Sequence, residues 1–180
     1  MASPDKRTAL VLSTVAVALA LVATAPSAWY VPSRLFLAPV LVALSVIDLR
    51  ERRLPDRIVL PSTVMAFVLL GGASLLDGVP RRVLWSVLGA AVFAGILFLL
   101  HLASPRGLGF GDVKLGLLLG LYLGTVNVAL VLWGLLFGSL LGAIVALVMV
   151  ARTRDRRVGI PFGPALSAGT VLALVLAGLH

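Results

Sequence analysis

The chain has 180 residues, of which 61% are hydrophobic and only 12% are charged. An average soluble domain carries roughly 25% charged residues, and a soluble chain of this length could not enclose so much apolar surface. Composition therefore excludes a soluble enzyme or DNA-binding module and predicts an integral membrane protein. The chain has no cysteine and two histidines, so disulfides and thiol chemistry are excluded, and neither a metal site nor a cofactor is expected.

Seven apolar segments divide the chain, and about 20 apolar residues cross a bilayer as a helix. We predict an all-α polytopic membrane protein, one membrane domain over residues 1–180, with helices at 8–25, 34–48, 58–76, 83–103, 112–123, 128–151 and 161–179. The fifth and sixth come from one run without charge between Lys114 and Arg152. At roughly 1.5 Å per residue that run is too long for one span, so we expect a turn at 124–127, Gly-Thr-Val-Asn.

The first apolar segment has two interpretations. Lys6 and Arg7, followed by an apolar run and then by Ala23-Thr24-Ala25 or Pro26-Ser27-Ala28, also fit a cleavable signal peptide. Cleavage would leave six helices. We favour a retained helix, because a polytopic protein needs no separate signal.

The basic residues predict an orientation. With a cytoplasmic N-terminus, the excess of 15 Lys and Arg over 7 Asp and Glu lies mainly inside, as the positive-inside rule requires, and need not indicate nucleic acid. The inside set is Lys6, Arg7, Arg50, Arg52, Arg53, Arg57, Arg106, Lys114, Arg152, Arg154, Arg156 and Arg157, and the outside set is Arg34, Arg81 and Arg82.

Two aspartates are candidates for chemistry. Asp48 closes the second predicted helix and Asp112 opens the fifth, so both are expected at the cytoplasmic boundary. Asp48 gains nothing as a helix cap, because an acid at a helix C-terminus opposes the macrodipole. Two facing carboxylates in a partly desolvated site do not both ionise easily, so one keeps its proton and the pair can act as acid and base on a water molecule. No metal or nucleophilic side chain is required.

The residues around these aspartates also have plainer explanations. Gly107, Gly109 and Gly111 permit close backbone approach and positive φ, but they also fit a connector with Asp112 as an N-cap. Asp56 after Pro55 is expected to be an N-cap, and Lys114 either snorkels to the head groups or holds the charge of the pair. Membrane anchoring explains Arg50, Arg52, Arg53 and Arg57, and helix initiation explains Pro161, Gly163 and Pro164.

Three segments, taken together, resemble the prepilin peptidases, or type IV leader peptidases, which are membrane aspartic proteases of the G-x-G-D class. They are Asp48-Leu49-Arg50-Glu51-Arg52-Arg53-Leu54-Pro55-Asp56, Gly107-Leu108-Gly109-Phe110-Gly111-Asp112-Val113-Lys114-Leu115 and Ile160-Pro161-Phe162-Gly163-Pro164. The resemblance covers roughly residues 35–180, which we expect to form the peptidase-like core.

The resemblance implies that Asp48 and Asp112 are the catalytic pair. Gly109, Gly111 and Lys114 would support the loop, and Arg53, Pro55, Asp56, Pro161, Gly163 and Pro164 would lie beside the site. The implied substrate is the basic leader of a type IV pilin or pilin-like precursor. The implied place of cleavage is the cytoplasmic side of a bacterial or archaeal cell membrane, just before the hydrophobic stem.

One departure from the family concerns methylation. Many bacterial members carry an N-terminal cytoplasmic domain with paired C-x-x-C motifs and also methylate the new N-terminus. This chain has no cysteine and no room for that domain, so we expect a peptidase-only form. Transfer of a labelled methyl group to cleaved pilin by the purified protein alone would contradict that expectation.

Two other functions fit a small apolar chain with a few acids. A proton- or cation-coupled transporter or channel subunit would favour acids near the bilayer midplane beside broken helices, whereas Asp48 and Asp112 are expected at one face. A non-catalytic assembly subunit predicts that Asp112→Asn leaves function intact.

Overall fold

A computed structural model describes residues 6–104, 107–153 and 161–178. Helices account for nearly all of these residues, and no β-strand occurs among them, as predicted. The seven α-helices of this described part are α1 (Lys6–Ala23), α2 (Val31–Glu51), α3 (Asp56–Leu76), α4 (Arg81–Ala103), α5 (Phe110–Val126), α6 (Leu130–Thr153) and α7 (Gly163–Gly178). The sequence does not predict the single 3-10 turn, Ala28–Tyr30, that precedes α2.

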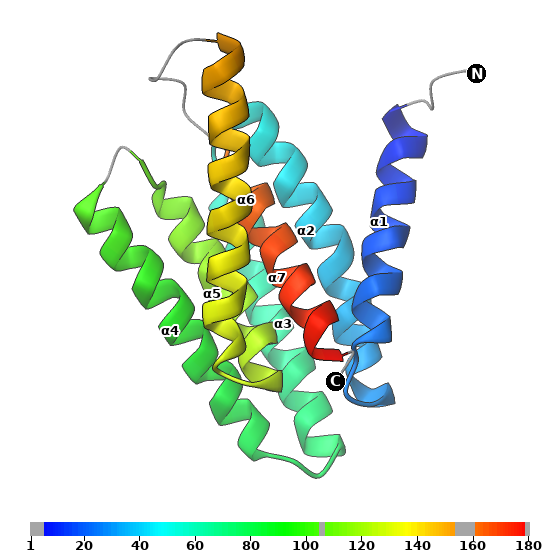
Figure 1. Ribbon diagram of the computed structural model, residues 1–180. Helices are drawn as coiled ribbons and strands as arrows, with labels where there is room; N and C mark the ends of the chain where they lie inside the picture. The colour runs from blue at the N-terminus through cyan, green and yellow to red at the C-terminus, as the bar shows by residue number, and fades with distance from the viewer. Residues whose placement is uncertain (1–5, 105–106, 154–160, 179–180) are drawn as a thin grey trace.

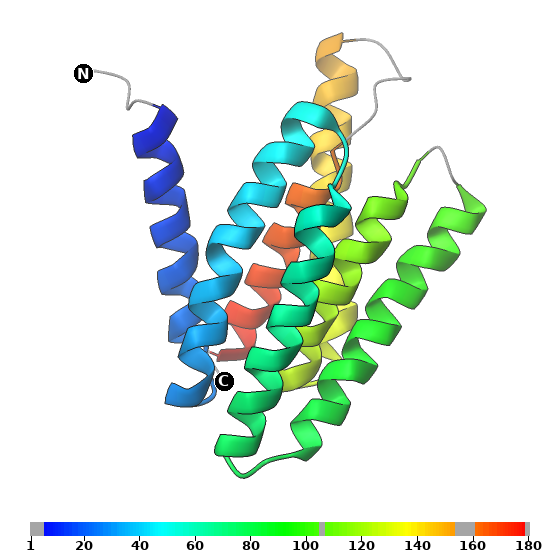
Figure 2. The same ribbon diagram turned by 180° about the vertical axis from the view of Figure 1, so that it is seen from behind.

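The helices run alternately up and down in one bundle (Figures 1 and 2). One end carries the N-terminus of α1, the ends of α2, α4 and α6, and the starts of α3, α5 and α7. We call it the upper end, as it lies in Figure 1. The lower end carries the connections from α3 to α4 and from α5 to α6.

The outward-facing surface of the bundle is apolar. Four segments are long and apolar enough to cross a membrane, namely Ala28–Glu51, Asp56–Leu76, Arg81–Ala103 and Leu130–Arg152, and Thr8–Ala23 and Gly163–Gly178 are shorter apolar helices. Large apolar side chains are exposed on every one of these long helices, more than a soluble monomer leaves open to water. The chain is therefore a multi-pass membrane protein, and helices satisfy its backbone groups within lipid.

Glycines pack α5 tightly against α4. α5 is buried along most of its length, and Gly116, Gly120 and Gly124 recur every fourth residue on it. A Cβ on Gly120 would lie 2.6 Å from Ala90 Cα, closer than real Cβ atoms approach. Small residues at this spacing let two helix backbones come together in a membrane, which holds α5, and with it Asp112, at the centre of the bundle.

The α4–α5 contact makes a prediction about stability. Gly120→Ala is expected to cost about 1–3 kcal/mol, because overpacking forces the two backbones apart. The matched control is Gly71→Ala on α3, where an added Cβ meets nothing within 4 Å. Unfolding midpoints of the purified variants in detergent measure both effects, and an unchanged midpoint for Gly120→Ala would contradict the tight contact.

The turn between the fifth and sixth helices lies later than predicted. α5 continues through Gly124 and Thr125 to Val126, and Asn127 is its C-cap. The Asn127 side chain accepts a hydrogen bond from the Ala129 N–H (2.9 Å), which is how asparagine forms turns. Gly124 serves helix packing, since a Cβ added to it would lie 2.9 Å from Gly89 Cα. The sequence pattern alone does not separate these two uses of glycine.

Arg34, the predicted first residue of the second helix, lies within α2 rather than at its start. α2 begins at Val31, and the Arg34 side chain is fully buried. Its guanidinium lies over the Tyr122 ring of α5, 5.5 Å from the centroid. None of its three nitrogens has a hydrogen-bond partner among the described residues. The cation–π contact is favourable, but it leaves the charge inside the protein rather than at the membrane surface.

Candidate active site

Asp48 lies in the last full turn of α2, and its side chain is buried. The Gly163 N–H, at the start of α7, donates a hydrogen bond to Asp48 Oδ2 (2.9 Å). Arg52 is the C-cap of α2; its backbone is left-handed (φ 53°), and its N–H donates to the Asp48 carbonyl. A negative charge on Asp48 interacts unfavourably with the C-terminal end of the α2 dipole, but favourably with the positive N-terminal end of the α7 dipole.

Asp112 lies in the first turn of α5 and is also buried. Its Oδ2 accepts a hydrogen bond from the Gly109 N–H (3.2 Å), and its own N–H donates to the Gly109 carbonyl (3.1 Å). Gly109 is thus the N-cap and Asp112 the third helical residue, the position from which an acid bonds back to the cap. The expected N-cap role of Asp112 is wrong by three positions.

The two aspartates line one cavity at the upper end of the bundle. Its volume is about 260 Å³, and it lies between the α2–α3 loop and the start of α5. The carboxylates are close enough for the charge of one to act on the other. The cavity is lined by Asp48, Arg52, Arg53, Leu54, Asp56, Gly109, Phe110, Gly111, Asp112 and Lys114.

The glycines before Asp112 act through their small size. Among the described residues, positive φ occurs only at Arg52 and Gly78, so the expected positive φ at Gly107, Gly109 and Gly111 is wrong. A Cβ on Gly111 would lie 3.0 Å from Leu54 Cβ. Gly111 therefore lets the α2–α3 loop approach α5 closely enough to bring Asp48 and Asp112 to one cavity.

Asp56 and Lys114, which both line the cavity, form an ion pair. The N-cap of α3 is Pro55, and Asp56 follows it without a capping hydrogen bond from its side chain, so the predicted capping role is wrong. Lys114 Nζ lies 2.6 Å from both carboxylate oxygens of Asp56 and 5.1 Å from the centroid of the Phe110 ring. Lys114 thus neither snorkels nor bonds the Asp48–Asp112 pair; it joins the α2–α3 loop to α5.

The third sequence segment enters the site through Gly163. Pro161 is buried, and Pro164 lies in the first turn of α7. A Cβ on Gly163 would lie 2.9 Å from Asp48 Oδ2. The sequence places Gly163 only beside the site, whereas it contacts the carboxylate directly; a glycine between two prolines is the one signal that points to it. Several residues of the sequence argument lie outside the described part of the chain, namely Arg106, Arg154, Arg156, Arg157 and Ile160.

Two buried carboxylates in one cavity, each bonded to a main-chain amide, define a membrane protein with a candidate acid–base pair. The model of the type IV leader peptidase family matches residues 35–147, a range that contains both aspartates. The chain belongs to the type IV leader peptidase family.

Curated relatives agree with this assignment. The chain is 36% identical over 173 residues to a prepilin leader peptidase/N-methyltransferase of Aeromonas hydrophila, covering 91% of this chain and 56% of the relative. A protein of the same name from Bacillus subtilis is 33% identical over 147 residues, covering 79% of this chain and 54% of the relative. The chain thus spans about half the length of these relatives. No solved structure matches.

Proposed function

We propose that this protein is an aspartic endopeptidase that removes the short basic leader from type IV prepilins or pilin-like precursors. The observation that carries the proposal is the shared cavity of Asp48 and Asp112. Membership of the leader peptidase family and the printed names of the relatives support the reaction and the class of substrate.

The proposed mechanism uses the two carboxyl groups and one water molecule. The ionised carboxylate takes a proton from the water molecule as the water oxygen bonds to the scissile carbonyl carbon. At the same time the protonated carboxyl group donates its proton to the carbonyl oxygen. The C–N bond of the resulting gem-diol then breaks. The leaving nitrogen takes the proton that came from water, and a diol hydroxyl returns its proton to the other carboxylate. We do not assign the base or the acid to Asp48 or to Asp112 individually, because two interacting carboxyl groups titrate as a pair.

The main-chain amides would orient both carboxylates for this reaction. Gly163 and Gly109 each donate to an Oδ2 atom, which leaves Oδ1 of each aspartate for water and substrate. Asp48 and Asp112 lie near helix ends, at one end of the bundle. This placement supports a peptidase over a proton- or cation-coupled transporter, whose acids would lie near the bilayer midplane.

We place the upper end in the cytoplasm and the protein in the inner or cell membrane of a bacterium or archaeon. Arg50, Arg52, Arg53 and Arg57 are exposed at this end, which the positive-inside rule assigns to the cytoplasm. The lower end carries Arg81 and Arg82, and Arg82 is paired with Asp77 (2.6 Å).

The test is cleavage of a prepilin by the purified protein in lipid vesicles. Mass spectrometry of the product is expected to show loss of the leader at a single bond. The double variant Asp48→Asn/Asp112→Asn is the blank for contaminating proteases. A wild-type rate no higher than that blank would overturn the proposed function.

The ion pair between Asp56 and Lys114 makes a further prediction for the same assay. Asp56→Ala and Lys114→Ala are each expected to lower kcat/KM about three- to tenfold, because the pair positions the α2–α3 loop against α5. Stability should change by less than about 1 kcal/mol, since both side chains are partly exposed.

A double-mutant cycle separates a shared role from two independent ones. The double alanine variant is expected to be no slower than the slower single variant. Arg57→Ala is the control, because Arg57 follows Asp56 but does not line the cavity. If the losses in kcat/KM of the two single variants multiply in the double variant, the pair does not act as a unit.

A further inference from the structure

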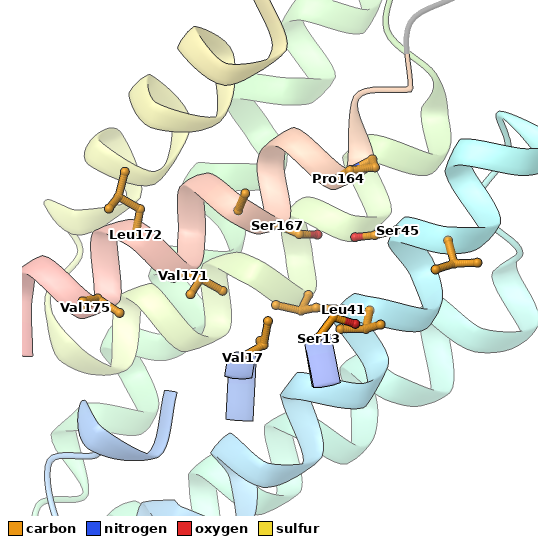
Figure 3. Close-up of a pocket in the computed structure, with 12 residues that line it drawn as sticks. Ser13, Val17, Leu41, Ser45, Pro164, Ser167, Val171, Leu172 and Val175 are labelled. Carbon is orange, nitrogen blue, oxygen red and sulfur yellow. The ribbon is translucent and has the colours of Figure 1, made fainter. Parts of the chain in front are cut away.

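An apolar groove separates α1 from α2 and α7 (Figure 3). Its volume is about 490 Å³, and none of the described residues that line it is charged. Leu41, Val42 and Val46 of α2 form one wall, and Val171, Leu172 and Val175 of α7 form another. Ser13 and Val17 of α1 lie on the third side. A groove of this composition fits an apolar partner.

The groove begins close to the candidate active site in the chain. Ser45 and Val46 line it and lie within one helical turn of Asp48. At its other wall, Pro164 lines the groove directly after Gly163, whose N–H bonds the Asp48 carboxylate. From Pro164 to Val175 the groove follows α7 for about 17 Å, away from the upper end and along the bundle.

Ser167 gives the groove a buried polar group, in addition to the hydroxyls of Ser13 and Ser45. Its side chain is 5% exposed, and its Oγ has no hydrogen-bond partner among the described residues. In Figure 3 its hydroxyl and that of Ser45 point toward each other across the groove. A buried hydroxyl without a partner costs free energy, so this position favours an occupant that brings a hydrogen-bonding group.

We infer that this groove binds the apolar helical segment of the precursor that follows the scissile bond. The inference rests on the proposed function. A peptide bond held between Asp48 and Asp112 must continue into the membrane from the upper end, and the groove begins within a turn of Asp48. The Ser167 hydroxyl would pair with a polar backbone or side-chain group of that segment. A lipid acyl chain also fits apolar walls but offers no such group.

The placement of α1 leaves room for this occupant. The N-terminal half of α1 stands apart from α2 and α7 in both views (Figures 1 and 2). Its side chains there are mostly exposed, and Leu21, near its other end, is buried. α1 would therefore form the outer wall against which a substrate helix packs near the upper end.

Filling the groove tests the inference. Leu172→Trp places a larger side chain on the α7 wall and is expected to raise KM for the precursor at least about tenfold, with kcat at saturation changed less than threefold. When a substitution removes binding energy equally from the ground state and the transition state, it raises KM and leaves kcat unchanged. The control is Leu132→Trp, which enlarges an exposed leucine on α6 and should leave KM within twofold of the wild type.

Ser167→Ala is a second test that the fold should tolerate, because the hydroxyl it removes has no partner. It is expected to raise KM about three- to tenfold without lowering the unfolding midpoint. In the Asp112→Asn background, a photoreactive benzoylphenylalanine at Val42 should cross-link the apolar segment of the precursor, and one at Leu132 should not.

The outcomes distinguish this inference from the proposed function. Suppose that the wild type cleaves the precursor, that KM is unchanged in both groove variants and that Val42 gives no cross-link. This result contradicts binding in the groove but not the proposed peptidase function. Cross-linking of lipid alone from Val42 likewise contradicts binding in the groove. A wild-type protein that cleaves no precursor overturns both.

Discussion

Asp112→Asn is expected to lower kcat for prepilin cleavage by at least about 1,000-fold, and Asp48→Asn by a similar factor. An amide cannot take a proton from water, and general acid–base catalysis contributes roughly 10²–10⁴-fold to such reactions. The geometry should survive, because the amide oxygen of asparagine can still accept the hydrogen bond from Gly109 or Gly163. KM is therefore expected to change less than about threefold. Initial rates in lipid vesicles measure both constants.

The control for this prediction is Glu51→Gln. Glu51 ends α2 only three residues after Asp48, but it is exposed and does not line the cavity. It should keep at least half of the wild-type kcat. Retention of more than a tenth of the wild-type kcat by either asparagine variant would contradict the pair and favour the non-catalytic assembly subunit.

The helices could be predicted because each depends on a local pattern. Apolar runs separated by charges, together with the length limit that divides the run between Lys114 and Arg152, give the number and order of the seven helices. The alternating direction of these helices places the end of α2 and the start of α5 at the same end of the bundle. That reasoning is enough to bring Asp48 and Asp112 together, as they line one cavity. It uses no detail of side-chain packing.

The errors arise where a residue type has two roles that only packing separates. Gly124 fits a turn by sequence, but it packs against Gly89 within a helix pair. Arg34 fits the outer end of a helix by charge, but α2 starts three residues earlier and the Arg34 side chain is buried beside Tyr122. Asp56 fits a helix cap, but Lys114, 58 residues away, takes its carboxylate. Each outcome depends on a neighbour distant in sequence.

The helix N-termini explain how a membrane protein keeps two acids buried side by side. The start of α7 faces Asp48 and the start of α5 holds Asp112, and each supplies a main-chain N–H and the positive end of a helix dipole. No basic side chain is hydrogen-bonded to either carboxylate within the described part of the chain. Main-chain amides would orient the oxygens and leave the protons free to move, as the proposed acid–base chemistry requires.

Gly163→Ala tests this account most directly and is expected to lower kcat about 100-fold. The new Cβ would lie 2.9 Å from Asp48 Oδ2, so the carboxylate must swing away and lose its bond to the Gly163 N–H. Displacement of a reacting group by about 1 Å can cost this much in rate. The displaced atoms end a flexible side chain, so the unfolding midpoint should fall by no more than a few degrees.

The matched control is Gly95→Ala on α4, where an added Cβ meets nothing within 4 Å and kcat should stay within twofold of the wild type. Rates and unfolding midpoints are measured on the same preparations, so that a loss of activity is not confused with a loss of fold. If Gly163→Ala cleaves prepilin at the wild-type rate, the amide of α7 does not orient Asp48. The third sequence segment would then act only in starting the last helix.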